Sequence, residues 1–138
     1  MSNKVKAAFK SFHQVMSYEL DAYGHVNNAV FLNYLEKARN DFLAQRGLRF
    51  QDFFKWEKLP VVTKAAVVFK CPAKAGDKLD ITGEISNYSR ISFTLSYSIT
   101  NQDTHQLILS GETTHVFVDT NGKPLRIPAE FIEKFLEQ

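Results

Sequence analysis

The sequence predicts an α+β fold in which one antiparallel sheet is covered by a single long helix. Several segments alternate apolar and polar residues, which is the period of a β-strand with one buried face. Short polar turns join the later segments, and such turns favour antiparallel neighbours. Residues 28–46 instead carry their apolar side chains at helical spacing. A sheet with one apolar face and a helix to cover it form a two-layer domain.

The first part of the chain is expected to hold a strand, the long helix and a short helical turn. Residues 8–18 alternate imperfectly and are expected to form the strand. Gly47 favours an end of the long helix after residue 46, because glycine readily adopts the left-handed conformation that comes after a helix. Residues 50–54 are expected to form the short helical turn. The main apolar stripe of the long helix consists of Phe31, Leu35, Ala38 and Phe42.

The rest of the chain is expected to supply four strands and a short last helix. The strands are expected at residues 61–70, 79–85, 91–100 and 107–118. The third of these is the clearest, because its odd-numbered residues are apolar and its even-numbered residues are Ser or Thr. Pro128 suits the first position of a helix, since a backbone N–H at that position has no helical partner in any case. The apolar face of the last helix consists of Phe131, Ile132, Phe135 and Leu136.

Length and composition narrow the class of protein. The chain has 138 residues, of which 44% are hydrophobic and 23% charged, so we expect one globular domain over residues 1–138. A net charge of +2 without a basic cluster argues against a nucleic-acid partner. Cys71 is the single cysteine, which excludes an internal disulfide and fits a reducing compartment. Because the chain shows neither a secretory signal nor an apolar run near the ~20 residues of a membrane span, we expect a cytoplasmic protein without a membrane partner.

The segment richest in chemistry precedes the long helix. It reads Asp-Ala-Tyr-Gly-His-Val-Asn-Asn over residues 21–28. A helix N-terminus offers unpaired backbone N–H groups and the positive end of the helix dipole. A carboxylate beside such donors can activate water against a carbonyl carbon whose oxygen they bind, or attack that carbon directly. Taken alone, the spacing favours the simpler interpretation that Asp21 caps a turn.

With the order of elements, this motif resembles the hotdog-fold acyl-CoA thioesterases, and in particular the 4-hydroxybenzoyl-CoA thioesterase-like family. The resemblance covers nearly the whole chain. Three further segments carry it: residues 34–39 in the long helix, residues 72–77 between strands, and residues 111–119 in the last long strand. It implies a single hotdog domain, in which a curved antiparallel five-stranded sheet wraps around one long central helix.

The resemblance also implies how the protein works. Two chains would pair their sheets edge to edge, as a homodimer or as a tetramer formed from two dimers, with active sites at the dimer interface. The substrate would be an acyl-CoA thioester, hydrolysed to free acid and coenzyme A. Coenzyme A is then part of the substrate, and no separate cofactor or metal is expected.

The family's catalytic residues can be placed on this sequence. Its carboxylate falls on Asp21, as general base or nucleophile, and its oxyanion donor falls on the backbone N–H of Asn28. Plant acyl-carrier-protein thioesterases share the His-Val-Asn-Asn string, and their active-site histidine falls on His25. Those enzymes carry Asn where this chain has Tyr23. This difference argues against the plant-type arrangement and leaves the simpler mechanism with Asp21 and the helix N-terminus.

Other residues of the motif have simpler alternatives. His25 is expected either to take part in the chemistry or to hold the loop by a hydrogen bond. Asn27 is expected to cap the helix, with contact to the thioester as the alternative. Gly24 is expected to permit a tight backbone, and Tyr23 either lines the substrate pocket or packs in the core.

Charged and metal-binding candidates outside the motif are fewer. Arg90, in the turn before the clearest strand, is the first candidate for the phosphates of coenzyme A. Weaker candidates are Lys64, Lys70, Lys74 and Arg126. Glu36 is expected to form a structural ion pair on the long helix. His105 and His115 have no third ligand nearby, so a metal site is not expected.

Three functions are open at this point. An acyl-CoA thioesterase is favoured, with an acyl-carrier-protein thioesterase as its variant. The second is a non-catalytic protein that binds acyl thioesters in the same groove. The third is a hotdog dehydratase, whose motif the sequence does not show. The length and type of the acyl group are left open.

Overall fold

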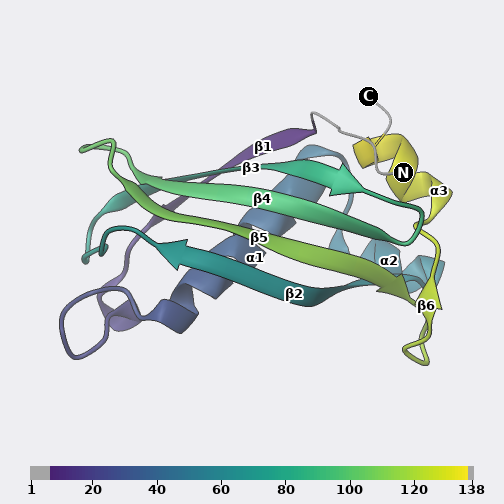
Figure 1. Cartoon of the computed structure of the whole chain (residues 1–138), viewed down its shortest axis with the longest axis horizontal. Coiled ribbons are helices and arrows are strands. Elements are labelled where there is room, and N and C mark those ends of the chain that lie inside the picture. The colour runs from purple at the N-terminus through teal and green to yellow at the C-terminus, as the bar shows by residue number, and fades with distance from the viewer. Residues whose placement is uncertain (1–6, 137–138) are drawn as a thin grey trace.

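The computed structural model describes residues 7–136, and its elements follow the predicted order (Figure 1). The two ends of the predicted domain, residues 1–6 and 137–138, lie outside the described residues. The strands are β1 (Ala8–Gln14), β2 (Leu59–Phe69), β3 (Lys78–Tyr88), β4 (Ser92–Asn101), β5 (Leu107–Val118) and β6 (Pro124–Leu125). The helices are α1 (Asn28–Gln45), α2 (Phe50–Trp56) and α3 (Ala129–Phe131), with a 3₁₀ turn η1 (Ser17–Glu19) and a π-helical turn η2 (Ile132–Leu136).

The strands form one antiparallel sheet in the order β1-β3-β4-β5-β2, and the short β6 pairs with β5. In Figure 1, α1 runs diagonally behind the sheet and covers one of its faces. This arrangement confirms the predicted α+β class and the five-stranded sheet, to which β6 adds two residues.

The core lies between α1 and one face of the sheet. In β4, Phe93, Leu95, Tyr97 and Ile99 are buried, while the Ser and Thr residues between them are half-buried on the other face. The predicted stripe of α1 is buried as well, together with Tyr34. The buried residues of β4 and of α1 therefore match the sequence pattern. The exception is Ile91, which precedes β4 and is exposed.

The first strand is shorter than predicted. It ends at Gln14, and the backbone N–H of Val15 then donates to the carbonyl of Asp77. The chain turns through η1, where the Glu19 carboxylate accepts a hydrogen bond from the backbone N–H of Met16 (2.8 Å). This turn sets the point from which the segment over residues 21–28 starts.

The edge strand β2 departs from its predicted alternation. All of its residues are exposed or half-buried, and Val61, Val62, Val68 and Phe69 are exposed. A register shift lies between Val62 and Lys64. Within residues 7–136, β2 pairs only with β5, so its outer edge is open. A long open edge with apolar side chains is a surface that pairs readily with another strand.

Candidate active site

The loop after η1 is closed by its own carboxylate. The backbone N–H of Asp21 donates to the carbonyl of His25 (2.8 Å), and that of Gly24 donates to the carbonyl of Asp21 (3.1 Å). Asp21 Oδ1 accepts from the backbone N–H groups of Tyr23 (2.8 Å) and His25 (3.3 Å). Gly24 has a φ of 77°, a left-handed conformation that side chains with a Cβ rarely adopt. The other carboxylate oxygen, Oδ2, accepts no hydrogen bond from the described residues.

Backbone contacts hold this loop against η1 and against the segment between β2 and β3. Leu20 and Val26 form an antiparallel bridge across its base. The N–H of Val26 donates to the carbonyl of Ala73 (2.9 Å), and that of Asn27 donates to the carbonyl of Glu19 (3.0 Å). The loop therefore has a fixed position relative to the start of α1.

A small polar cluster secures Glu19 in turn. The Glu19 carboxylate lies 2.9 Å from His13 Nε2 and accepts a hydrogen bond from the Tyr34 hydroxyl (2.9 Å). Burial opposes the charge of Glu19, but hydrogen bonds from His13, the Met16 backbone and Tyr34 outweigh it and lower the pKa of Glu19. Burial and the neighbouring Glu19 raise the pKa of Tyr34. The cluster is thus a charged anchor beneath the loop.

The N-terminus of α1 leaves one donor unused. Asn27 is the N-cap, as predicted, and its side chain accepts from the backbone N–H of Ala29 (2.9 Å). The N–H of Val30 donates to the carbonyl of Asn27 (2.9 Å). The N–H of Asn28 has no hydrogen-bond partner within the part of the chain that the structure covers. It is therefore available to an acceptor that is not part of the described chain.

A cavity of about 240 Å³ brings the predicted catalytic residues together. Its lining is Asp21, His25, Val26, Asn28, Phe31, Phe69, Lys70, Cys71 and Pro72. The His25 ring, which is half-buried, makes no hydrogen bond with the described residues. The cavity thus combines a free carboxylate oxygen, an imidazole and an unpaired backbone donor beside an apolar wall.

The predicted binding residues are placed differently. Tyr23 is 87% exposed and does not line this cavity, while Gly24 shapes the loop behind it. Arg90 is exposed in the turn between β3 and β4, at the end of the sheet opposite the loop that precedes α1 (Figure 1). Lys70, one of the weaker candidates for the phosphates of coenzyme A, lines the cavity.

The prediction for Glu36 is wrong. Within residues 7–136, the ion pair on this part of α1 joins Lys37 to Asp41 (3.0 Å), and Glu36 takes no part in it. Glu36 instead lines a second cavity of about 300 Å³ between α1 and the sheet. Arg39 and His115 line the same cavity, and sequence reasoning assigned neither of them a role there.

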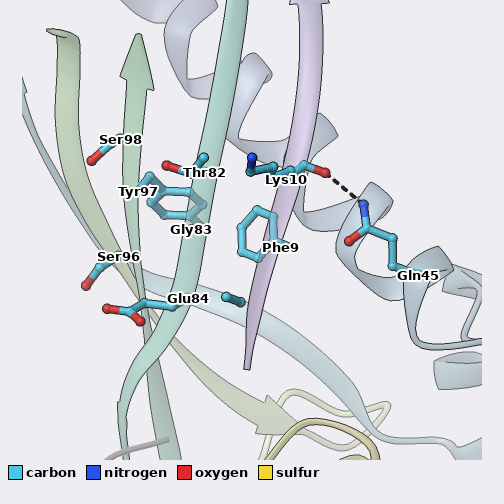
Figure 2. A pocket seen from close by; sticks show the side chains of 10 residues that line it. Phe9, Lys10, Gln45, Thr82, Gly83, Glu84, Ser96, Tyr97 and Ser98 are labelled. Carbon is cyan, nitrogen blue, oxygen red and sulfur yellow. Dashed lines mark hydrogen bonds between the residues drawn. The ribbon is translucent and has the colours of Figure 1, made fainter. Parts of the chain in front are cut away.

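A third hollow is lined by residues of β1, β3 and β4 and by Gln45 of α1. Figure 2 shows its lining, with Phe9 on β1, Thr82 and Glu84 on β3, and Ser96, Tyr97 and Ser98 on β4. A methyl group on Gly83 would overlap the ring of Phe9, so β3 must carry glycine where this ring crosses it. None of the predicted site residues lines this hollow.

The described residues contain no group of three His, Cys, Asp or Glu side chains arranged to hold a metal ion. They also contain no helix long and apolar enough to cross a membrane.

Comparison with known proteins identifies the family. The model of the thioesterase-like superfamily matches residues 15–135, and the chain therefore belongs to this superfamily. The chain is 35% identical over 130 residues to the long-chain acyl-CoA thioesterase FadM of Escherichia coli (strain K12), covering 91% of this chain and 94% of that protein. It is 30% identical over 129 residues to the acyl-acyl carrier protein thioesterase ATL3 of Arabidopsis thaliana, covering 91% of this chain and 68% of that protein.

A solved structure shows the same fold. The 1,4-dihydroxy-2-naphthoyl-CoA thioesterase Slr0204 of Synechocystis superposes with a TM-score of 0.87, covers 94% of this chain and 96% of its own, and is 23% identical. This likeness confirms the predicted hotdog arrangement of one sheet and one long helix.

Proposed function

We propose that this protein hydrolyses acyl-CoA thioesters, with Asp21 as general base or nucleophile. The observation that carries the proposal is one cavity lined by both Asp21, whose Oδ2 accepts no hydrogen bond from the described residues, and Asn28, whose N–H has no partner among them. The family supplies the class of reaction, and FadM, a relative of similar length, is named for long-chain acyl-CoA substrates.

The proposed reaction follows from these two groups. The thioester oxygen accepts a hydrogen bond from the N–H of Asn28 at the positive end of α1, which stabilises the negative charge that develops there. Such a donor typically lowers the barrier by about 3 kcal/mol. Asp21 takes a proton from the attacking water and passes it to the departing thiolate. In the alternative route, Asp21 attacks the carbonyl carbon, the thiolate leaves, and water hydrolyses the resulting mixed anhydride.

The site is proposed to be completed by a second copy of the chain. The open edge of β2 carries Val61 and Val62 near one end and Phe69 at the other. Antiparallel pairing of two β2 edges would bring the Val61 end of one chain beside the Phe69 end of its partner. Val61 lines the second cavity and Phe69 lines the cavity of Asp21, so each active site would combine one cavity from each chain.

The same pairing gives Arg90 a role. The turn between β3 and β4, which holds Arg90, lies at the end of the sheet opposite the loop that precedes α1 (Figure 1). Pairing would bring that end toward the partner's site. We therefore keep Arg90 as a contact of the coenzyme A phosphates. The assembly is a homodimer or a dimer of dimers, the location is cytoplasmic, and no further cofactor takes part.

The test is release of free thiol from a panel of short, long and aromatic acyl-CoAs. We expect turnover by the wild type, its loss in Asp21→Asn, and a raised KM with little change in kcat in Arg90→Glu. A stable, active monomer in sedimentation would overturn the shared site. Saturable acyl-CoA binding without turnover would instead favour a binding protein.

A second candidate is hydrolysis of acyl groups from acyl carrier protein, favoured by the likeness to ATL3. Parallel assays with the same acyl group on coenzyme A and on acyl carrier protein decide between them through the ratio of kcat/KM.

A further inference from the structure

The second cavity differs from that of Asp21 in its chemistry. It lies between α1, α2 and the buried face of the sheet, and aromatic rings such as Phe93, Phe131 and Phe135 make up much of its wall. Two residues with nitrogen donors, Arg39 and His115, interrupt this apolar lining. The His115 side chain is nearly enclosed, and its ring is stacked on Phe93 with centroids 4.8 Å apart.

These two residues are the ends of a chain of hydrogen bonds. Arg39 Nη1 donates to the hydroxyl of Tyr97 (3.3 Å), because a guanidinium can only donate. The hydroxyl of Tyr97 has one hydrogen, and Thr113 Oγ1 at 2.6 Å is the acceptor within its reach among the described residues. Thr113 in turn lies 2.7 Å from His115 Nε2 and donates to it. Counting one hydrogen for each hydroxyl therefore assigns Nε2 as an acceptor and places the ring proton on Nδ1.

The same accounting leaves donors unused at both ends. His115 Nδ1 has no hydrogen-bond partner in residues 7–136, yet every fully enclosed side-chain nitrogen or oxygen of these residues has one. Nδ1 is therefore not enclosed, and because the ring lines the cavity, its N–H is open to the cavity. Arg39 makes a single hydrogen bond with the described residues through its five N–H groups. Burial, and secondly the charge of Arg39, lower the pKa of His115 to about 3, which is consistent with a neutral ring.

We propose that this cavity selects acyl groups that carry a neutral hydrogen-bond-accepting oxygen, a hydroxyl or keto group, bound by Arg39 and by Nδ1–H of His115. This inference rests on the proposed function, since it takes the cavity as the acyl pocket. A plain hydrocarbon chain would pack against the aromatic rings. It would also leave both donors without water and without an acceptor, which costs binding free energy. Glu36 and Arg39 carry opposite charges in the same lining, so the cavity has no net positive charge that would favour a carboxylate over a neutral oxygen.

The test is a scan of one hydroxyl group along a fixed chain. Decanoyl-CoA and its hydroxydecanoyl-CoA isomers are titrated into the Asp21→Asn protein by calorimetry, so that binding is measured without turnover. We expect one hydroxyl position to bind about tenfold or more tightly than decanoyl-CoA, as in sites built to pair a substrate hydroxyl. Arg39→Met and His115→Phe, each combined with Asp21→Asn, should reduce that ratio to about one, and they keep the length or the stacking of the replaced side chain.

Arg49→Met is the matched control, because it removes an exposed guanidinium at the start of α2 and should keep the full ratio. Equal affinity for every isomer, or a preference that survives both cavity variants, would overturn the proposal. So would dissociation of the Arg39→Met protein in sedimentation, which would assign Arg39 to contacts between subunits. If His115→Phe fails to fold, Arg39→Met alone decides. Failure of hydrolysis in the wild type would reject the proposed function and leave this binding ratio measurable.

Discussion

Two loops of this chain share one local structure and differ in the element that each one leads into. Residues 21–25 and 119–123 both read Asp-x-x-Gly-x. In each, the aspartate N–H donates to the carbonyl four residues on, at 2.8 and 2.9 Å, and the glycine N–H donates to the aspartate carbonyl. In each, Oδ1 of the aspartate accepts from the backbone N–H groups two and four residues on. The glycine φ values, 77° and 83°, also agree.

The surroundings of the two loops are different. The loop of Asp21 ends at the N-terminus of α1, beside the unpaired N–H of Asn28 and a cavity. The loop of Asp119 leads into the two-residue strand β6. The Asp-x-x-Gly pattern thus determines a turn and not a reaction. The cap uses Oδ1 of Asp21 and the proposed chemistry would use Oδ2, so the two interpretations of Asp21 do not exclude each other. We therefore expect the proposed chemistry to depend on the helix that follows the loop of Asp21.

The largest difference should appear in turnover when each aspartate becomes asparagine. The amide oxygen can still accept the loop hydrogen bonds, so both variants should fold with wild-type stability. We expect Asp21→Asn to lower kcat by about 10³-fold, the usual contribution of a positioned base, and Asp119→Asn to leave kcat unchanged. Thiol release and thermal unfolding measure both. Equal turnover in the two variants would leave Asp21 with its capping role alone.

The pH dependence of stability should come from the buried hydrogen-bond chain at His115 and not from either loop. The pKa of His115 is lowered to about 3 in the fold, by burial and then by Arg39, while an unfolded histidine titrates near 6.5. Between these values the unfolded chain binds the extra proton, so stability falls as pH falls, by about 1.4 kcal/mol per pH unit.

Urea unfolding between pH 7 and pH 5 measures how the unfolding free energy changes with pH. This interval lies above the pH range in which carboxylates become protonated. His115→Phe should flatten the pH dependence. The Asp119→Asn protein keeps His115, which binds a proton in its unfolded chain as in the wild type. That variant should therefore keep the wild-type dependence of unfolding free energy on pH. A slope that is unchanged in His115→Phe would assign it to another histidine.

Replacing the glycine of each loop by alanine should reduce stability equally but should reduce kcat in only one of the two variants. A methyl group added to Gly24 or to Gly122 would have no neighbour within 4 Å, so alanine meets only the strain of a positive φ. We expect Gly24→Ala and Gly122→Ala each to lose about 1–2 kcal/mol of unfolding free energy. Gly24→Ala should also lower kcat about tenfold, since it moves Asp21 relative to α1. A fall of kcat in both variants would show that stability, and not placement, limits turnover.

That Asp21, His25 and Asn28 line one cavity could be predicted from the sequence, because these residues are close together in the chain. Asp21, His25 and Asn28 lie within eight residues, and the loop and helix N-terminus that place them obey local rules. The second cavity could not be predicted, since Arg39 and His115 come from α1 and β5 and meet only when the sheet covers the helix.

Among the strands too, features set by neighbouring residues could be predicted, and features set by distant parts of the chain could not. The alternation of β4 was visible because one of its faces is buried within this chain. The exposure of β2 was not predictable from its own residues, because an edge position is a property of the whole sheet. The short β1 likewise follows from Val15 pairing with Asp77, which is distant in sequence.

The smallest effect we expect comes from the cap that distinguishes the two loops. Asn27 holds the N–H of Ala29, and no helix directly succeeds the other loop to need such a cap. Asn27→Ala should lose about 1 kcal/mol of unfolding free energy, the usual value of an N-cap. Because the N–H of Asn28 belongs to the same turn, kcat should fall as that turn frays. Asn33→Ala removes an exposed amide from the middle of α1 and serves as the control, with stability and kcat retained. A loss of stability in Asn27→Ala without any change in kcat would mean that the first turn of α1 does not hold the thioester oxygen.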